Sequence, residues 1–351
     1  MKPAFLFTLI VATNLFAQSQ CETSGPIPFH ENGKWGYISA TGVAVPPRFD
    51  SASSFTNDGA TVCISDQCGL IGKDGTFLGP TRDRKIKPFP GDYSEGLAPT
   101  QNNDRWGYVD FSGNVVIPFQ FVFAGAFKDG IAKVGTASKQ FFINHKGERV
   151  TPEFRGVSEF HEGLAAVDTG KNIGYIDRDG TFALPPLHNG ASGMDFSEGM
   201  AATRVNGKVG FMDKTGSILI APKYDDAYPF SDGLAVVILG NKWGYVDKLG
   251  NVVIPIQYEI AHTFSEGVAS VESGGKWGYI DPSGHYVIPL EFDSAMPFCG
   301  GVAAVETFRA GKTNPLCRNP EKIGKHGFIN HSGSYVWRDE KEHTWGPDFC
   351  F

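Results

Sequence analysis

The sequence predicts an all-β repeat array, and three observations support this fold class. A five-letter pattern, Lys or Arg followed by Trp-Gly-Tyr and Val or Ile, occurs at 34–38, 105–109, 242–246 and 276–280. Counting degenerate copies, the glycine position of this pattern recurs after 33 to 38 residues, with one longer step of 49 near the C-terminus. A fixed period in this range is typical of solenoids, propellers and related arrays. Between the copies, short β-branched and aromatic runs alternate with Gly, Asp, Asn and Pro, which indicates strands joined by tight turns.

Each unit of about 34 residues is predicted to contain three strands. In the clearest unit they cover 234–237, 242–246 and 252–254, and Pro255 ends the third. Side chains alternate along a strand, so Trp243 and Tyr245 share one face, and Gly244 lies on the other. A glycine inside a strand indicates that another backbone or a bulky side chain approaches closely. We expect this structural role for Trp35 and Gly36, Trp106 and Gly107, Trp243 and Gly244, and Trp277 and Gly278.

Two architectures are compatible with such units. An open, curved β-solenoid is preferred, because it requires no fixed number of units. A closed β-propeller-like ring is the alternative, although three strands per unit are few for a propeller blade. Contact between the first and last units would favour the ring.

The combination of K-W-G-Y-I-D, G-x-V-V-I-P and F-S-E-G-L-A-A-V segments resembles the WG-repeat (KWG-repeat) family of bacterial proteins. The resemblance covers roughly residues 30–337. It implies an all-β repeat protein, often exported, that binds a ligand or partner. It supplies no catalytic residues.

The N-terminus is typical of an exported protein. Residues 1–17 combine Lys2 with a short apolar run, as in a signal peptide, and we expect cleavage after Ala17. The remaining chain is expected to contain a lead-in at 18–30, the repeat array at 31–337 with an insertion at 306–324, and a C-terminal cap at 338–351. No later apolar run is long enough to span a bilayer, so we expect no membrane insertion after cleavage and a secreted, periplasmic or cell-envelope location.

The cysteines agree with export. Cys63 and Cys68 lie on consecutive predicted strands with four residues between them, and we expect them to be bridged in an oxidising compartment. The pairing of Cys21, Cys299, Cys317 and Cys350 stays open at this point.

The sequence contains no pattern that predicts a catalytic, cofactor or metal site. The residue at the Asp247 position is Ser, Gly or Asn in other units, so a turn role is favoured over calcium binding. Motifs for hydrolases, zinc proteases and phosphate-binding loops are missing. The net charge of −7 argues against nucleic acid as a partner. We expect a non-catalytic monomer without cofactors.

The predicted function is therefore an exported binding or interaction scaffold for an unknown protein. Two charged columns recur, a Lys or Arg before the Trp position and an Asp or Glu before the next strand, and we interpret both as solvated turns joined by ion pairs. The insertion supplies a candidate binding surface for an anionic partner, with Arg309, Lys312, Arg318 and Lys322. The alternative is a cell-wall or glycan-binding module that uses exposed Trp and Tyr side chains.

Overall fold

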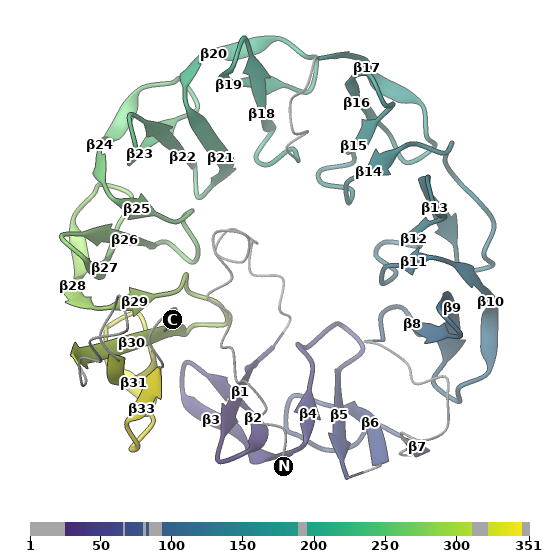
Figure 1. The fold of residues 1–351 in the computed structure, drawn as a ribbon, viewed down its shortest axis with the longest axis horizontal. Helices are drawn as coiled ribbons and strands as arrows, with labels where there is room; N and C mark the ends of the chain where they lie inside the picture. The colour runs from purple at the N-terminus through teal and green to yellow at the C-terminus, as the bar shows by residue number, and fades with distance from the viewer. Residues whose placement is uncertain are drawn as a thin grey trace, which may run out of the picture.

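The computed structural model describes residues 25–65, 67–79, 82–83, 93–188, 195–310 and 322–345. Across these residues the regular elements are β-strands, which form nine antiparallel sheets. The sheets follow one another around a ring (Figure 1). This arrangement confirms the predicted all-β repeat array. No helix in these ranges is long and apolar enough to cross a membrane.

The sheets are numbered here in chain order. The first has β1 (Ile27–Glu31), β2 (Lys34–Ser39) and β3 (Gly42–Phe49). The second has β4 (Ser51–Ala52), β5 (Ala60–Ile64), β6 (Gln67–Ile71) and β7 (Arg82–Asp83). The third has β8 (Leu97–Asn102), β9 (Arg105–Asp110) and β10 (Val115–Phe121), and the fourth has β11 (Phe123–Ala124), β12 (Ile131–Gly135) and β13 (Gln140–Asn144).

The remaining sheets repeat this plan. The fifth has β14 (Gly156–Val157), β15 (Ala165–Asp168), β16 (Ile173–Ile176) and β17 (Phe182–His188), and the sixth has β18 (Met200–Val205), β19 (Lys208–Asp213) and β20 (Ile218–Tyr224). The seventh has β21 (Asp226–Ser231), β22 (Leu234–Leu239), β23 (Lys242–Asp247) and β24 (Val252–Tyr258). The eighth has β25 (Ile260–Ala261), β26 (Ala269–Ser273), β27 (Lys276–Ile280) and β28 (Tyr286–Phe292). The ninth has β29 (Ser294–Ala295), β30 (Ala303–Ala310), β31 (Lys322–Ile329), β32 (Tyr335–Arg338) and β33 (His343–Trp345).

A strand that the sequence did not predict precedes the three expected ones in several units. It spans two residues in β4, β11, β14, β25 and β29, and six in β21. Its pairing with the following strand is short; in the eighth sheet it joins only Ile260 to Glu272 and Ala261 to Val271. Two paired residues are too few to leave a periodic signal in the sequence. The objection that three strands are few for a blade therefore does not apply to the sheets that contain β4, β14, β21, β25 and β29, which have four or five strands.

The last strand of most units runs along the outside of the ring, as β10, β20, β24 and β28 do in Figure 1. We call these the rim strands. The rim strand β24 crosses close to β23, so a Cβ added at Gly244 would lie 2.6 Å from the Ile256 Cα. The same crowding recurs at Gly36, Gly107 and Gly278, which explains the glycine column. In the fourth sheet, whose described strands include no rim strand, Phe141 occupies the glycine position.

The interior between the sheets is apolar and aromatic. Tyr245 is fully buried, and its hydroxyl donates to the His262 carbonyl at 2.7 Å. Tyr37, Tyr108 and Tyr279 make the equivalent hydrogen bond to a backbone carbonyl 16 or 17 residues later. These tyrosines fill the space between strands and satisfy their polar group within the unit, so their faces are not available to a ligand.

The first and last sheets are in contact. Phe29 of β1 packs edge-to-face against Trp337 of β32, with ring centroids 5.4 Å apart, and the Trp337 indole donates to Glu31 at 3.3 Å. Phe29, Ile38 and Val302 belong to one buried cluster. These contacts favour the ring alternative over the preferred open solenoid, because the ends of an open solenoid do not meet.

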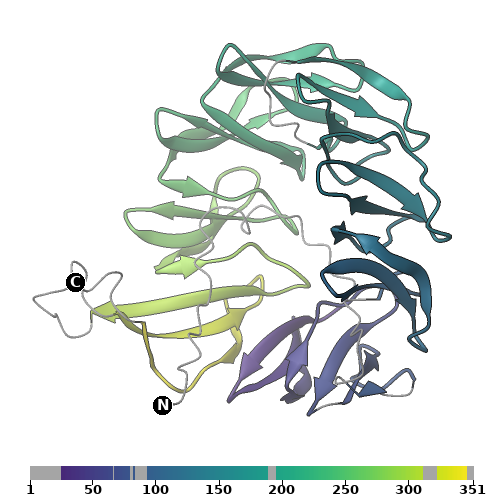
Figure 2. The same ribbon diagram turned by 45° about the vertical axis from the view of Figure 1, so that its right-hand side comes forward.

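The ninth sheet is longer than the others. β30 and β31 pair continuously from Ala303 with Ile329 to Ala310 with Lys322, and β33 adds to the far end of β31. Figure 2 shows this hairpin projecting from the ring in yellow-green. Residues 306–310 and 322–324 of the predicted insertion are therefore strand, and 343–345 of the predicted cap complete the same sheet.

Candidate functional site

The tryptophans of the repeat are half-buried and partly covered by stacking. Trp243 lies parallel to Tyr228 at an angle of 11°, with ring centroids 5.5 Å apart. Trp277 stacks in the same way on His262, at 4.9 Å. Trp35 meets His30 edge-to-face, and Trp106 packs on the apolar cluster of the third and fourth sheets. At Trp243 and Trp277 one ring face is occupied, whereas a sugar platform needs an open face.

The lysine column forms ion pairs with a carboxylate that follows the rim strand. Lys208 contacts Asp225 at 2.6 Å, Lys242 contacts Glu259 at 2.8 Å, and Lys34 and Lys276 make the equivalent pairs. The Gly240 amide in the β22–β23 turn donates to the other oxygen of Asp225. The hydrogen bond from Lys208 lowers the pKa of Asp225. Each such carboxylate therefore joins one sheet to the hairpin of the next.

The acidic column forms a second contact between sheets, built on a two-residue turn. Glu198 and Gly199 have φ values of 52° and 83°, so both residues of the turn are left-handed, as in a type I′ turn. The Glu198 carboxylate accepts from the Gly233 amide of the seventh sheet at 3.1 Å. Ser197, just before it, donates to the Phe230 carbonyl at 2.7 Å. We call this pair of contacts the acidic latch.

The latch recurs around the ring and includes a Lys, Arg or His side chain. Acidic side chains accept from the next glycine amide at Asp58, Glu95, Glu162, Glu198, Asp232 and Glu266. Serine donates to the next unit's carbonyl at Ser94, Ser197, Ser231 and Ser265. A Lys, Arg or His side chain from the next sheet lies beside the acid in the pairs Glu95–His145, Asp129–Arg178, Glu162–Lys214, Glu198–Lys248 and Glu266–His331. Burial is the largest single influence on Glu162 and opposes its charge, but the hydrogen bond and charge of Lys214 together with the backbone amides of Gly199 and Glu198 outweigh burial and lower the pKa of that carboxyl.

Both charged columns therefore hold the sheets together, but through partners that the sequence did not reveal. The lysines pair with the acids after the rim strands, not with the acidic column. The acidic column pairs with the residue after the Asp position of the turn, for example Lys248 after Asp247. The periodic spacing of the two columns indicated that their side chains form repeated ion pairs. Only the stacking of the sheets shows which residues are the partners of each column.

The turn at Asp247 has the local role that its spacing predicted. The carboxylate accepts from the amides of Leu249 and Asn251, and Gly250 has φ of 83°. The side-chain hydrogen bond from Asn251 lowers the pKa of Asp247. Within the described ranges, no group of three or more His, Cys, Asp or Glu side chains is placed to hold a metal ion.

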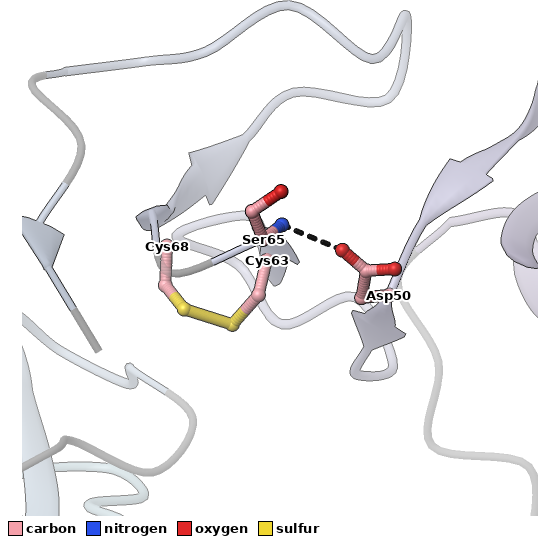
Figure 3. The surroundings of a disulfide bond; sticks show 4 residues. All are labelled: Asp50, Cys63, Ser65 and Cys68. Carbon is pink, nitrogen blue, oxygen red and sulfur yellow. Dashed lines mark hydrogen bonds between the residues drawn. A yellow bond between two sulfur atoms is a disulfide. The ribbon is translucent and has the colours of Figure 1, made fainter. Parts of the chain in front are cut away.

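Cys63 and Cys68 are bridged across the β5–β6 hairpin (Figure 3). They pair directly in the strand register, with Cα atoms 4.0 Å apart, and both are buried. The turn between them is tied to the preceding strand, because Asp50 accepts from the Ser65 amide at 2.6 Å. Cys68 stands at the tryptophan position of its unit, so the disulfide replaces a packed indole. Cys299 is also disulfide-bonded.

The predicted basic surface of the insertion is only partly described. The Arg309 guanidinium pairs with Glu342, with the closest contact at 2.7 Å, and this pairing raises the pKa of Arg309. Lys322 begins β31, opposite Ala310 and Trp345. Lys312 and Arg318 lie outside the described residues. The structure therefore brings Arg309 to an internal carboxylate and places Lys322 at the start of β31.

The sequence analysis missed two features. His262 is buried, its Nδ1 lies 2.7 Å from the Ser270 hydroxyl, and burial lowers its pKa to about 4. Exposed apolar pairs recur at the start of the rim strands: Val115 and Val116, Ile218 and Leu219, Val252 and Val253, and Tyr286 and Val287. These exposed pairs correspond to the two residues before the Ile of the G-x-V-V-I-P pattern. The sequence alone did not reveal their exposure, because a strand buried on both faces has the same apolar residues.

A family comparison agrees with the geometry of these units. The model of the WG containing repeat matches residues 35–67, 106–135, 141–172, 173–208, 210–243, 243–277 and 277–307. Together these segments cover more than half of the chain. The chain belongs to the WG-repeat family. The segment 68–105 and the chain after 307, with the extended hairpin, fall outside the matched repeats. A search of curated protein sequences found no match.

The solved structures that resemble this WG-repeat protein have β-propeller or repeat-type folds. A crystal structure of a eukaryotic initiation factor aligns with a TM-score of 0.58 at 12% identity, covering 91% of this chain and 96% of the other. Two bacterial structures align with lower scores. PorZ, a surface component of the type IX secretion system of Porphyromonas gingivalis, has a TM-score of 0.33 and 11% identity over 85% of this chain and 45% of its own. The extracellular domain of a hybrid two-component system of B. thetaiotaomicron has a TM-score of 0.36 and 10% identity over 90% and 56%.

Proposed function

We propose that this WG-repeat protein is an exported, non-catalytic scaffold that binds a protein partner through its outer rim. The observation that carries the proposal is the recurrence of exposed apolar side chains at the same two positions of successive rim strands. Leu219 is 53% exposed, Val253 41% and Val287 44%. Contiguous exposed apolar surface on a soluble protein marks interaction sites.

The rim is also suited to side-chain recognition rather than to strand addition. Pro255 and Pro289 are the fourth residues of β24 and β28, and Pro222 is the fifth residue of β20. Proline has no amide hydrogen, so it blocks a continuous ladder with another strand. Uncontrolled edge pairing is thereby discouraged, while the apolar side chains stay exposed.

Export is supported by the charged and apolar N-terminal stretch and by the Cys63–Cys68 disulfide, since disulfides persist in oxidising compartments. Glycan binding is the alternative function. The stacking of Trp243 on Tyr228 and of Trp277 on His262 weighs against it, because a ring face that already packs on a neighbour is not free for a sugar.

The test compares two variants that add the same charge to the same strands. Leu219→Glu with Val253→Glu places carboxylates on the apolar positions, and Ala221→Glu with Gln257→Glu places them on exposed neighbouring positions. Capture of proteins from an envelope extract is measured beside binding to purified peptidoglycan and polysaccharides. We expect the first variant to lose the captured protein at least tenfold and the second to retain it. Equal capture by both variants, or retention on a polysaccharide that depends on Trp243, would refute the proposal.

A further inference from the structure

The lysine column loses its acidic partner at two neighbouring junctions of the ring. In the other described junctions the acid is held in register by its backbone amide, which donates to a carbonyl of the next hairpin, as in Asp225. Val122 and Arg155 make the same backbone hydrogen bond, to Gly135 and Asp168, at 2.8 and 2.9 Å. These two residues therefore occupy the position that an acid holds elsewhere.

The column cations of these two units are left without that acid. Arg105 and Lys139 precede Val122 and Arg155 by 17 and 16 residues, the separations found in the ion pairs of the column. Across the described ranges, neither Arg105 nor Lys139 makes an ion pair. At the second junction, two cations stand at the positions where other units hold a cation and an acid within 2.8 Å of each other.

The unpaired positions lie at the hairpin turns of the third, fourth and fifth sheets, which are neighbours in the ring (Figure 1). We call the exposed cations there the basic patch; they are Arg105, Lys139, Arg155 and Lys171. Two acids lie among them. Asp168 is 3.9 Å from Arg155 and already accepts from the Gly170 amide at 2.7 Å, and Asp104 precedes Arg105 in the chain. Four cations against two acids leave the patch positive on a protein whose net charge is −7.

Exposed apolar side chains accompany these cations. Val122 is 44% exposed and Phe123 is 42% exposed. Phe123 pairs with Gly135 in the fourth sheet, and the Lys133 Nζ lies 5.9 Å from the centroid of its ring. In four other units an Asp or Glu stands at the Val122 position. The combination of exposed apolar surface with cations is therefore particular to this junction among the described ones.

We propose that the basic patch binds an acidic segment of a partner protein, in which Asp or Glu side chains alternate with aromatic or aliphatic ones. The carboxylates of the segment pair with Arg105, Lys139 and Arg155, as the chain's own acids pair with the column in other units. Its apolar side chains pack on Val122 and Phe123. Interfaces between proteins are enriched in arginine and aromatic residues, whereas an acidic polysaccharide supplies charge without apolar side chains.

The charge of the whole protein adds selectivity for this position. A net charge of −7 repels an acidic partner from the rest of the surface, whereas the patch attracts it. The inference rests on the binding role proposed above but uses other residues. The variant Leu219→Glu with Val253→Glu leaves the patch unchanged, so the two proposals fail separately.

Fluorescence anisotropy with defined polyanions tests the patch on the full exported protein. The labelled probes are the copolymer poly(Glu,Tyr), poly-Glu and polygalacturonate, compared at equal charge concentration. We expect poly(Glu,Tyr) to bind at least tenfold more tightly than polygalacturonate, with poly-Glu between them and with affinity falling as salt increases. Equal affinity for the three polymers, or binding of none, would overturn the proposal.

Restoring the repeat pattern removes the patch and keeps the fold. Val122→Asp with Arg155→Asp gives Arg105 and Lys139 the carboxylates that the column has in other units. We expect this variant to unfold at the wild-type temperature or higher and to bind poly(Glu,Tyr) at least tenfold more weakly. Wild-type affinity in this variant would show that the patch is not the binding surface.

Two further variants separate position and apolar contact from charge. Lys146→Asp with Ala221→Glu changes the net charge by the same amount at exposed positions outside the patch, and we expect it to keep wild-type affinity. Phe123→Ser should weaken binding of poly(Glu,Tyr) at least threefold and leave binding of poly-Glu unchanged. An equal loss in the Lys146→Asp control and the restored variant, or an equal effect of Phe123→Ser on both polymers, would contradict the assignment.

Discussion

At Glu198 the acidic latch combines an unfavourable backbone conformation with favourable side-chain contacts, and substitutions can separate these two effects. Glu198 has φ of 52°, a left-handed conformation that costs a non-glycine residue about 1 kcal/mol. The same conformation aims its carboxylate at the Gly233 amide and at Lys248, 3.0 Å away. Alanine removes these contacts and keeps the strain, whereas glycine removes the contacts and the strain together.

The magnitudes follow from the contacts. A hydrogen bond from a backbone amide to a carboxylate contributes about 1.5 kcal/mol, at the low end of the range because the Glu198 side chain is 28% exposed. The ion pair with Lys248 adds about 0.5 kcal/mol at the surface. We therefore expect Glu198→Ala to lower the free energy of unfolding by about 2 kcal/mol and Glu198→Gly by about 1 kcal/mol.

Urea unfolding of both variants measures the difference, and amide exchange at Gly233 reports the lost hydrogen bond directly. Exchange at Gly233 should accelerate in both variants, because both lack the acceptor. Glu198→Gln is the control that keeps a neutral acceptor and should fall between wild type and alanine. If glycine proves as costly as alanine, the positive φ carries no strain and the argument fails.

Three further predictions follow from other parts of the ring. Gly244→Ala should lower the free energy of unfolding in urea by more than about 2 kcal/mol, because the added Cβ would overlap the rim-strand backbone. Gly250→Ala should lower it by about 1 kcal/mol, because the added Cβ meets only side chains. Equal losses would contradict the crossing of β24 over β23. Replacing both Cys63 and Cys68 by serine should lower stability by about 2 kcal/mol, the value expected for so short a loop, and unchanged thermal unfolding would contradict it. His262 has a folded pKa of about 4, below its unfolded value, so the unfolded chain takes up the proton first as the pH falls. Stability should therefore decline by roughly 3 kcal/mol between about pH 6.5 and pH 4, and a His262→Asn variant measured over the same range should lose that dependence.

Periodicity was enough to predict the units, their class and much of their local chemistry. The spacing of Gly244 and its equivalents identified the second strand of each unit and a close backbone approach there. The variation at the Asp247 position predicted a turn, and Asp247 accepts from the amides of Leu249 and Asn251. The strand pairing of Cys63 with Cys68 followed from a short hairpin. Each of these features depends on residues close together in the chain, so the sequence alone determines them.

The tertiary structure decided what depends on neighbouring sheets. Contact of Phe29 with Trp337 joins residues about 300 positions apart, and no local pattern specifies such a contact. In the sequence, several acidic positions of the repeat could pair with each basic position. Only the stacking of the sheets shows that Glu198 pairs with Lys248 and that Lys208 pairs with Asp225. The short strands such as β25 arise only where a neighbouring strand is already in place to accept two residues. Local periodicity therefore determines each sheet, and the packing of sheet against sheet determines the ring and the surface that it leaves exposed.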